Sequence, residues 1–368
     1  MTDTHHAPLF EPLTLGAVEL KNRVLMAPLT RNRAHPDGTP WEEAEKYYAQ
    51  RAGAGLIFTE ATQISPLGKG YINTPGIHED KHVEAWSKIT KAVHDAGGKI
   101  AIQLWHVGRI SHTSLLPDGE QPLAPSALRA NGQTFTEDGM TDVSEPRAMN
   151  LDDIKALIDQ YRTAAENAKK AGFDAIEVHA ANGYLLDQFL RDGSNKRNDA
   201  YGGVAENRVR LLKEVLDTVI EVYGADKVGV RLSPTGGFND MSDSDPKGTF
   251  TTVVKALNEY SLAFLHVVEE FPGEDTNEEE QAVIRAVRDA WDGPYIANGG
   301  LDAEKAAKMV EDGKADAVTF GRPYIANPDL AERIRTGAKW NEPDHETFYG
   351  GDEKGYTDYP TLDEQKAA

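Results

Sequence analysis

The sequence predicts an α/β fold, a (βα)8 TIM barrel, on three observations. Eight short runs of apolar residues, rich in Val and Ile, are nearly continuous, as strands covered on both faces are. Amphipathic stretches with a helical period separate most of these runs, which is the alternation expected of βα units. The chain has 368 residues, modestly more than the roughly 250 that are usual for this barrel. An open, doubly wound sheet is the alternative, but the count of eight strands favours the barrel.

The predicted strands occupy, in chain order, residues 24–28, 56–62, 99–105, 175–180, 228–233, 263–269, 294–299 and 317–321. Helical patterns precede the second to the fifth strand, at residues 42–52, 82–98, 151–172 and 205–224. Several of these patterns stop at glycine, as helix C-termini commonly do.

Two further segments frame the predicted barrel. Residues 9–22 alternate in polarity around Gly16, which predicts a β-hairpin that closes the bottom of the barrel. Residues 107–150 follow the third strand, are rich in Pro, Gly and Ser, and show no helical period. We expect them to form a capping insertion over the mouth of the barrel. No repeat other than the βα unit is visible, so we expect residues 1–368 to form a single domain.

The charge and residue content exclude several classes of protein. Lys and Arg number 39 against 60 Asp and Glu, a net charge of −21, and such a surface repels nucleic acids and anionic membranes. There is no cysteine, which removes disulfides, thiolate metal sites and cysteine nucleophiles together. No secretory signal or membrane-spanning stretch is visible. We therefore expect a cytoplasmic enzyme with a small-molecule substrate, either a monomer or a homodimer.

Chemistry in (βα)8 enzymes lies at the C-terminal ends of the strands, and two of the predicted ends suggest a phosphate site. The seventh strand ends in Asn298, Gly299 and Gly300, and the eighth in Gly321 and Arg322. Glycines allow backbone amides to approach a ligand closely, and arginine offers a forked cation. Because the chain has neither a dinucleotide-binding G-x-G-x-x-G after a strand nor a Walker motif, FMN is a good candidate for the phosphate compound.

Other strand ends carry polar side chains that could face a flavin ring, namely Thr30, Gln103 and Arg231. A buried arginine is costly unless it is paired. The alternative for Arg231 is therefore an ion pair with an acid such as Glu177. A reduced flavin, which carries negative charge, would also offset the burial.

Metal binding is the competing use of three histidines on or beside strands, His106, His179 and His266. Their spacing matches no metal motif, and no thiolate accompanies them. We interpret His266 as a core histidine with satisfied hydrogen bonds, favour the same for His106, and predict no metal site.

The stretch "HAANGYLL" (179–186) places three hydrogen-bonding side chains where the fourth strand ends: His179, Asn182 and Tyr184. One helical turn would put positions 179 and 182 on the same face. Both can donate N–H groups to a carbonyl or nitro oxygen as negative charge develops there. The residues alone leave a polar turn open as the alternative.

Segments along nearly the whole chain resemble the old yellow enzyme family of flavin-dependent ene-reductases. The resemblance is to its branch of N-ethylmaleimide reductase and pentaerythritol tetranitrate reductase in particular. It rests on the segments "FEPLTLGAVELKNRVLMAPLTRNRA", "TEATQIS", "IQLWHVGRISH", "EVHAANGYLLDQFLRDGSNKRNDAYGG", "VRLSPTGGFNDM", "NGGL", "FGRP" and "GYTDYP". The family is an FMN-containing (βα)8 barrel that uses NADPH, or sometimes NADH, to reduce activated C=C bonds.

The resemblance implies a role for each matching residue. The residues that would bind FMN are Pro28, Thr30, Ala61, Gln103, Arg231, Asn298, Gly299, Gly300, Gly321 and Arg322. His179 and Asn182 would bind the substrate oxygen, and Tyr184 would deliver a proton. Tyr71, Trp105 and Tyr356 would line the substrate pocket.

The activity implied is NAD(P)H-driven reduction of enones, enals, maleimides and nitroalkenes by ping-pong hydride transfer through flavin N5. The alternatives are a reductase acting mainly on nitrate esters or nitro compounds, and a non-catalytic flavin-binding protein. A metal-dependent (βα)8 hydrolase or aldolase is a third class, but it would need more acidic residues at the strand ends. Val107 stands where several relatives carry Thr, which leaves fine substrate preference undetermined.

Overall fold

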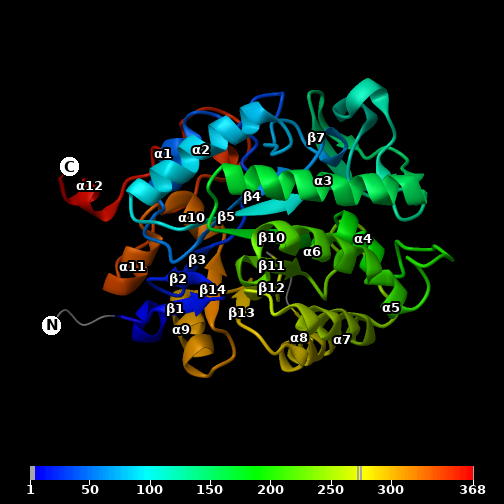
Figure 1. The fold of residues 1–368 in the computed structure, drawn as a ribbon. Helices are drawn as coiled ribbons and strands as arrows, with labels where there is room; N and C mark the ends of the chain where they lie inside the picture. The colour runs from blue at the N-terminus through cyan, green and yellow to red at the C-terminus, as the bar shows by residue number, and fades with distance from the viewer. Residues whose placement is uncertain (1–4, 272, 274–275, 368) are drawn as a thin grey trace.

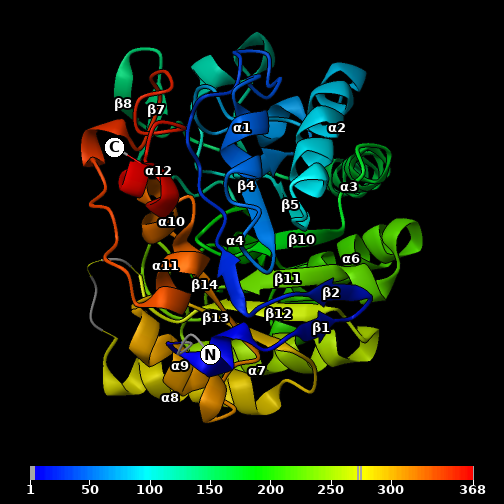
Figure 2. The ribbon, with the colours of Figure 1, turned by 90° about the vertical axis from the view of Figure 1, so that its left-hand side faces the viewer.

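Eight parallel strands close into a barrel in the computed structural model, which describes residues 5–271, 273 and 276–367. Their order around the barrel is β10-β11-β12-β13-β14-β3-β4-β5, so neighbours in sequence are neighbours in space and the last strand pairs with the first (Figures 1 and 2). The predicted (βα)8 barrel is confirmed. The barrel strands are β3 (Val24–Met26), β4 (Ile57–Gln63), β5 (Ile100–Trp105), β10 (Ala175–Ala180), β11 (Val228–Leu232), β12 (Phe264–Val268), β13 (Tyr295–Asn298) and β14 (Ala317–Phe320).

Helices surround the strands, as Figure 2 shows in a view from another side. They are α1 (Ala44–Ala49), α2 (Asp80–Asp95), α3 (Leu151–Lys170), α4 (Leu185–Leu190), α5 (Ala205–Arg208), α6 (Arg210–Tyr223), α7 (Pro246–Leu257), α8 (Glu278–Ala290), α9 (Ala303–Glu311), α10 (Arg322–Ala326), α11 (Leu330–Thr336) and α12 (Leu362–Ala367). The α3 helix begins at a capping box, in which Asn150 and Asp153 each accept the other's backbone N–H.

The N-terminal hairpin closes the bottom of the barrel, as predicted. Strands β1 (Leu13–Leu15) and β2 (Val18–Leu20) pair antiparallel around Gly16. Their apolar side chains belong to the same buried cluster as Phe58 and Phe264, whose rings meet edge to face at 5.5 Å inside the barrel. Gly16 has a φ of 57°, and a Cβ atom there would lie 2.0 Å from the carbonyl oxygen of Asp226.

The insertion after β5 contains two small sheets. Strands β6 (Leu123–Ala124) and β9 (Arg147–Ala148) pair in parallel, and β7 (Gln133–Thr136) and β8 (Gly139–Asp142) form a hairpin. The insertion bonds to loops that follow other barrel strands, because Ile72 N–H donates to Phe135 and Asn131 N–H donates to Asp240. It therefore covers the C-terminal ends of the strands. The single-domain organisation stays a prediction. None of the helices in the described residues is long and apolar enough to cross a membrane.

Glycine at position 229 is required by packing between two barrel strands. A Cβ atom there would lie 2.1 Å from the ring of Phe264 on the neighbouring strand. We expect Gly229→Ala to lower the free energy of unfolding by about 1–3 kcal/mol, because added volume in a filled core forces side chains out of their rotamers. Gly53→Ala is the control, since no atom lies within 4 Å of its Cβ position. Urea unfolding of both variants checks this, and equal midpoints would contradict it.

Candidate active site

The C-terminal ends of the barrel strands converge on one cavity. It is lined by Pro28, Thr30, Ala61, Gln103, Trp105, His179, Asn182, Tyr184 and Arg231. All nine are residues that the sequence singled out, and they come from five strands or the turns that follow them. The closed parallel barrel brings these ends together although the residues are far apart in the chain.

A chain of buried hydrogen bonds inside the barrel orients the side chain of Gln103. Its Nε2 atom donates to Glu177 Oε1 at 2.7 Å, and Glu177 Oε2 lies 2.6 Å from Nδ1 of His266. The other ring nitrogen of His266 lies 2.9 Å from the hydroxyl of Thr319. Both nitrogens of His266 thus have partners, which confirms the interpretation of a satisfied core histidine. Each carboxylate oxygen of Glu177 thus has one partner.

The guanidinium of Arg231 is buried at the cavity wall. It donates from Nη2 to Asn298 Oδ1 at 2.8 Å, while Nε finds no hydrogen-bond partner among the described residues. Glu177, the acid considered as an ion-pair partner, bonds instead to Gln103 and His266. Burial lowers the pKa of Arg231, but a guanidinium remains charged near neutral pH. The cavity wall therefore contains a buried positive charge, and its Nε–H group lacks a partner among the described residues.

His179 and Asn182, called here the donor pair, lie on either side of the point where β10 passes into a turn with left-handed backbone conformation. Strand β10 ends at Ala180, and Asn182 and Gly183 follow with φ of 59° and 73°. The expectation of one helical turn is therefore wrong, although both side chains do reach the cavity. Asparagine and glycine are the residues that tolerate this conformation, which explains why the sequence reads "NG" here.

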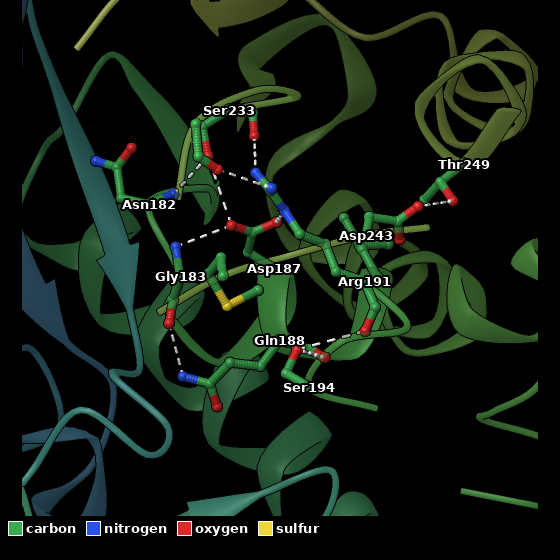
Figure 3. Close-up of polar contacts among 12 residues, drawn as sticks. Asn182, Gly183, Asp187, Gln188, Arg191, Ser194, Ser233, Asp243 and Thr249 are labelled. Carbon is green, nitrogen blue, oxygen red and sulfur yellow. Dashed lines mark hydrogen bonds and ion pairs between the residues drawn. The ribbon is translucent and has the colours of Figure 1, made fainter. Parts of the chain in front are cut away.

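Buried polar groups hold this turn in place (Figure 3). The N–H of Asn182 donates to Ser233 Oγ at 2.7 Å, and the N–H of Gly183 donates to Asp187 Oδ2 at 2.8 Å. Asp187 in turn pairs with Nε of Arg191 at 3.0 Å, one helical turn further along. The sequence did not predict this support. The only signal for it in the sequence is that Asp187 and Arg191 lie four residues apart in a mostly apolar stretch.

The side chains of His179 and Asn182 have atoms left for a ligand. Nδ1 of His179 and Oδ1 of Asn182 are buried and lack a partner in the part of the chain that the structure describes. Oδ1 can only accept a hydrogen bond, so the group of Asn182 that can donate to a substrate oxygen is its amide Nδ2. Burial, aided by the nearby charge of Arg231, holds the pKa of His179 well below its usual range. The imidazole is therefore neutral at physiological pH and can donate one N–H to an oxygen atom.

Three aromatic side chains form the wall beside this pair. The hydroxyl groups of Tyr184 and Tyr71 lie 3.1 Å apart, the ring of Tyr71 stacks on Trp105 at 5.8 Å, and Trp105 meets Tyr184 edge to face at 5.0 Å. Burial raises the pKa of both phenols. Tyr184 is therefore protonated at neutral pH and hydrogen-bonded to a second phenol.

Tyr356 lies apart from this wall. It is buried, stacks on Tyr47 at 4.1 Å and is not among the residues that line the cavity. Tyr349, in the same C-terminal segment, is 63% exposed and does not line the cavity either.

Two buried arginines just after Thr30 fix that C-terminal segment. Arg31 donates to the carbonyl oxygens of Phe348 at 2.9 Å and Gly355 at 2.7 Å. Arg33 donates to that of Asp352 at 3.0 Å. The segment that carries Tyr349 is thereby attached to the end of β3.

The predicted phosphate loops lie side by side because β13 and β14 are paired. Gly299 and Gly300 have φ of 109° and 60°, and a Cβ at either position would collide with Glu270. Arg322 is exposed at the start of α10, and the Cβ position of Gly321 meets no atom closer than 3.4 Å. The carboxylate of Glu270 packs against Gly300, so an anion at this glycine requires that side chain to turn away.

These features fit a flavin mononucleotide. The buried cation of Arg231 suits the electron-rich edge of a reduced ring. The free polar atoms of His179 and Asn182 remain available to a second ligand. Together with the glycine loops and Arg322 next to a strand end, the site defines a class of protein, an FMN-dependent oxidoreductase built on a (βα)8 barrel.

The chain belongs to the NADH:flavin oxidoreductase / NADH oxidase family, whose model matches residues 8–341. A relative from Leishmania infantum, named a probable flavin mononucleotide-dependent alkene reductase, is 43% identical over 359 residues, which cover 96% of this chain and 97% of the relative. The structure is similar to that of morphinone reductase in complex with tetrahydroNAD, with a TM-score of 0.91, 48% identity, and coverage of 97% of this chain and 98% of the other. It is also similar to the old yellow enzyme homologue from Zymomonas mobilis, with a TM-score of 0.93, 46% identity, and coverage of 96% and 99%. The resemblance to the old yellow enzyme family is confirmed.

The support behind the donor turn can be tested at Ser233. We expect Ser233→Ala to weaken the binding of a phenol such as 4-hydroxybenzaldehyde about tenfold, because the buried N–H of Asn182 loses its acceptor and the turn loosens. FMN content should not change. Ser194→Ala is the matched control, since its hydroxyl is equally buried nearby but donates to Gln188 and does not contact the turn (Figure 3). Equal losses in both variants would show that the effect is only structural.

Proposed function

We propose that this FMN-dependent enzyme is an ene-reductase. It uses NADPH, or NADH, to reduce C=C bonds activated by a carbonyl or nitro group, as in enones, enals, maleimides and nitroalkenes. The observation that carries the proposal is the arrangement of His179, Asn182 and Tyr184 in one cavity with Arg231. Bound FMN would supply the hydride chemistry between nicotinamide and alkene, held by the glycine loops, Thr30, Gln103 and Arg231.

The donor pair accounts for activation of the alkene. The neutral N–H of His179 and the amide of Asn182 bind the substrate oxygen, and they stabilise it best when it becomes negatively charged during the reaction. No carboxylate of the described residues lines the cavity to oppose that charge. Because the groups are fixed by a buried network, they need no rearrangement as the charge develops.

Tyr184 accounts for the proton that the product requires. Its phenol lies beside the donor pair, with the two rings of His179 and Tyr184 meeting at 5.2 Å. It protonates the α-carbon, and the hydrogen bond from Tyr71 stabilises the phenolate that remains. The nearby charge of Arg231 also favours that phenolate, because it counteracts the effect of burial on the pKa of Tyr184.

One cavity serves both substrates in this proposal. The nicotinamide and the alkene bind in turn over the same donors, which implies ping-pong kinetics and removes the need for a separate dinucleotide-binding domain. The same donors can bind the oxygen of a nitro compound or a nitrate ester, so such compounds are a second substrate class to assay.

The cofactor and activity are tested on the purified protein. We expect it to be yellow, to release about one FMN per chain on denaturation, and to oxidise NADPH or NADH when cyclohexenone is added under nitrogen. Release of FAD, or a colourless protein that cannot take up FMN, would contradict the cofactor. Rapid flavin reduction without any reduction of cyclohexenone, maleimide or nitrostyrene would contradict only the substrate class.

The proton donor is tested by Tyr184→Phe. We expect enone reduction to slow by at least about 10², the contribution of positioned proton transfer, whereas reduction of the flavin by NADPH changes little. Stopped-flow measurement of the two half-reactions separates these rates. Tyr161→Phe is the control, because its hydroxyl is buried on α3 without a partner among the residues described. Unchanged enone reduction, or equal losses in both half-reactions, would show that Tyr184 is not the acid.

A further inference from the structure

Two imidazoles and a carboxylate come together outside the cavity, where the loop after β4 enters α2. They belong to His78, Glu79 and His82, and one possible ligand atom of each lies within 4.8 Å of the others. None of the three lines the active-site cavity. The absence of a metal site, expected from the sequence, stays a prediction.

The imidazole of His82 is already held in an orientation that suits a metal ligand. Its side chain is fully buried, Nε2 lies 3.1 Å from the carbonyl oxygen of Asp37, and Nδ1 is buried without a partner within the described part of the chain. The nitrogen that faces a carbonyl must carry the proton, so Nδ1 presents its lone pair. Metal-binding histidines are usually oriented in this way, by an N–H bond from the second nitrogen to a carbonyl or a carboxylate.

Gly76 allows His78 to approach His82. The two rings meet edge to face at 4.6 Å, and a Cβ atom on Gly76 would lie 2.9 Å from both His78 Nε2 and His82 Cε1. The absence of a Cβ atom at position 76 therefore lets the two imidazoles lie in contact.

The third candidate ligand, Glu79, has an exposed side chain that can move, and it forms an ion pair with Lys81. The carboxylate of Glu79 is half exposed, and its Oε1 lies 3.7 Å from His78 Nδ1. The ammonium of Lys81 lies 3.0 Å from Glu79 and 3.1 Å from the carboxylate of Asp37. Lys81 is itself exposed and can move into solvent, so a divalent cation could take over its contact with Glu79.

We propose that His78, Glu79 and His82 form a binding site for a divalent transition-metal ion, with Zn²⁺ as the best match. Two imidazoles and one carboxylate suit Zn²⁺, and water would complete four-coordination. Tetrahedral zinc needs ligand atoms about 3.3 Å apart, so Glu79 and His78 must close in by a modest rotation toward the fixed His82. The ion would tie the loop of Asp37 to the start of α2, a structural role separate from the flavin chemistry.

Zinc binding is tested on the FMN-loaded protein after treatment with EDTA. We expect calorimetric titration with Zn²⁺ alone to show one site that is lost, or weakened at least tenfold, in both His78→Gln and Glu79→Gln. Lys81→Gln should bind zinc more tightly, because the competing ammonium is gone. These side chains are at least partly accessible, and the flavin absorbance shows whether each variant is folded.

The matched control is His94→Gln on the same helix. His94 also lies beside a carboxylate, with Nε2 2.8 Å from Asp174, but it lacks a second imidazole. It should leave zinc affinity unchanged. An unchanged affinity in His78→Gln, or an equal loss in His94→Gln, would overturn the proposal. A zinc anomalous peak between the three side chains, in crystals given one equivalent of Zn²⁺, would support it directly, and a peak only elsewhere would refute it.

Discussion

The buried guanidinium of Arg231 is the constraint on which the active site depends. A charge inside a barrel is stable only when polar groups or a ligand compensate it. Here Asn298 satisfies one N–H group, Glu177 contributes only at a distance, and another N–H remains free. The same charge helps to keep His179 neutral and favours the phenolate of Tyr184. One buried cation thus favours an electron-rich ligand. It also influences the protonation of His179 and Tyr184.

Three buried acids beside the cavity are not among the residues that line it. Glu177 is bonded to Gln103 and His266, and Asp187 to Gly183 and Arg191. Glu60 accepts the N–H of Arg31, and burial raises its pKa to about 7, which favours its neutral form. This separation matters because a carboxylate in the cavity would repel an anionic reduced ring and an enolate alike. The acids orient donors instead of facing the ligand.

The barrel and most of its site could be predicted because their signals are local. Each strand is a short apolar run, and each strand end marks a residue that the closed barrel must bring to the centre, as with Thr30 and Arg231. The Asp187–Arg191 support could not be predicted, because a buried ion pair looks like any polar pair on a helix. The stacking of Tyr356 on Tyr47, away from the cavity lining, depends on how a distant segment folds back onto Arg31. Such contacts arise from tertiary packing and leave no periodic pattern.

The attachment of the C-terminal segment to Arg31 has a consequence for biosynthesis. The acceptor of Arg31 Nε lies 317 residues later in the chain. At a usual ribosomal rate, roughly 15–60 s pass between the synthesis of the donor and that of its acceptor. During this interval the guanidinium groups of Arg31 and Arg33 must stay hydrated. Because β14 ends at Phe320, the last barrel strand is synthesised before the segment that these two arginines hold.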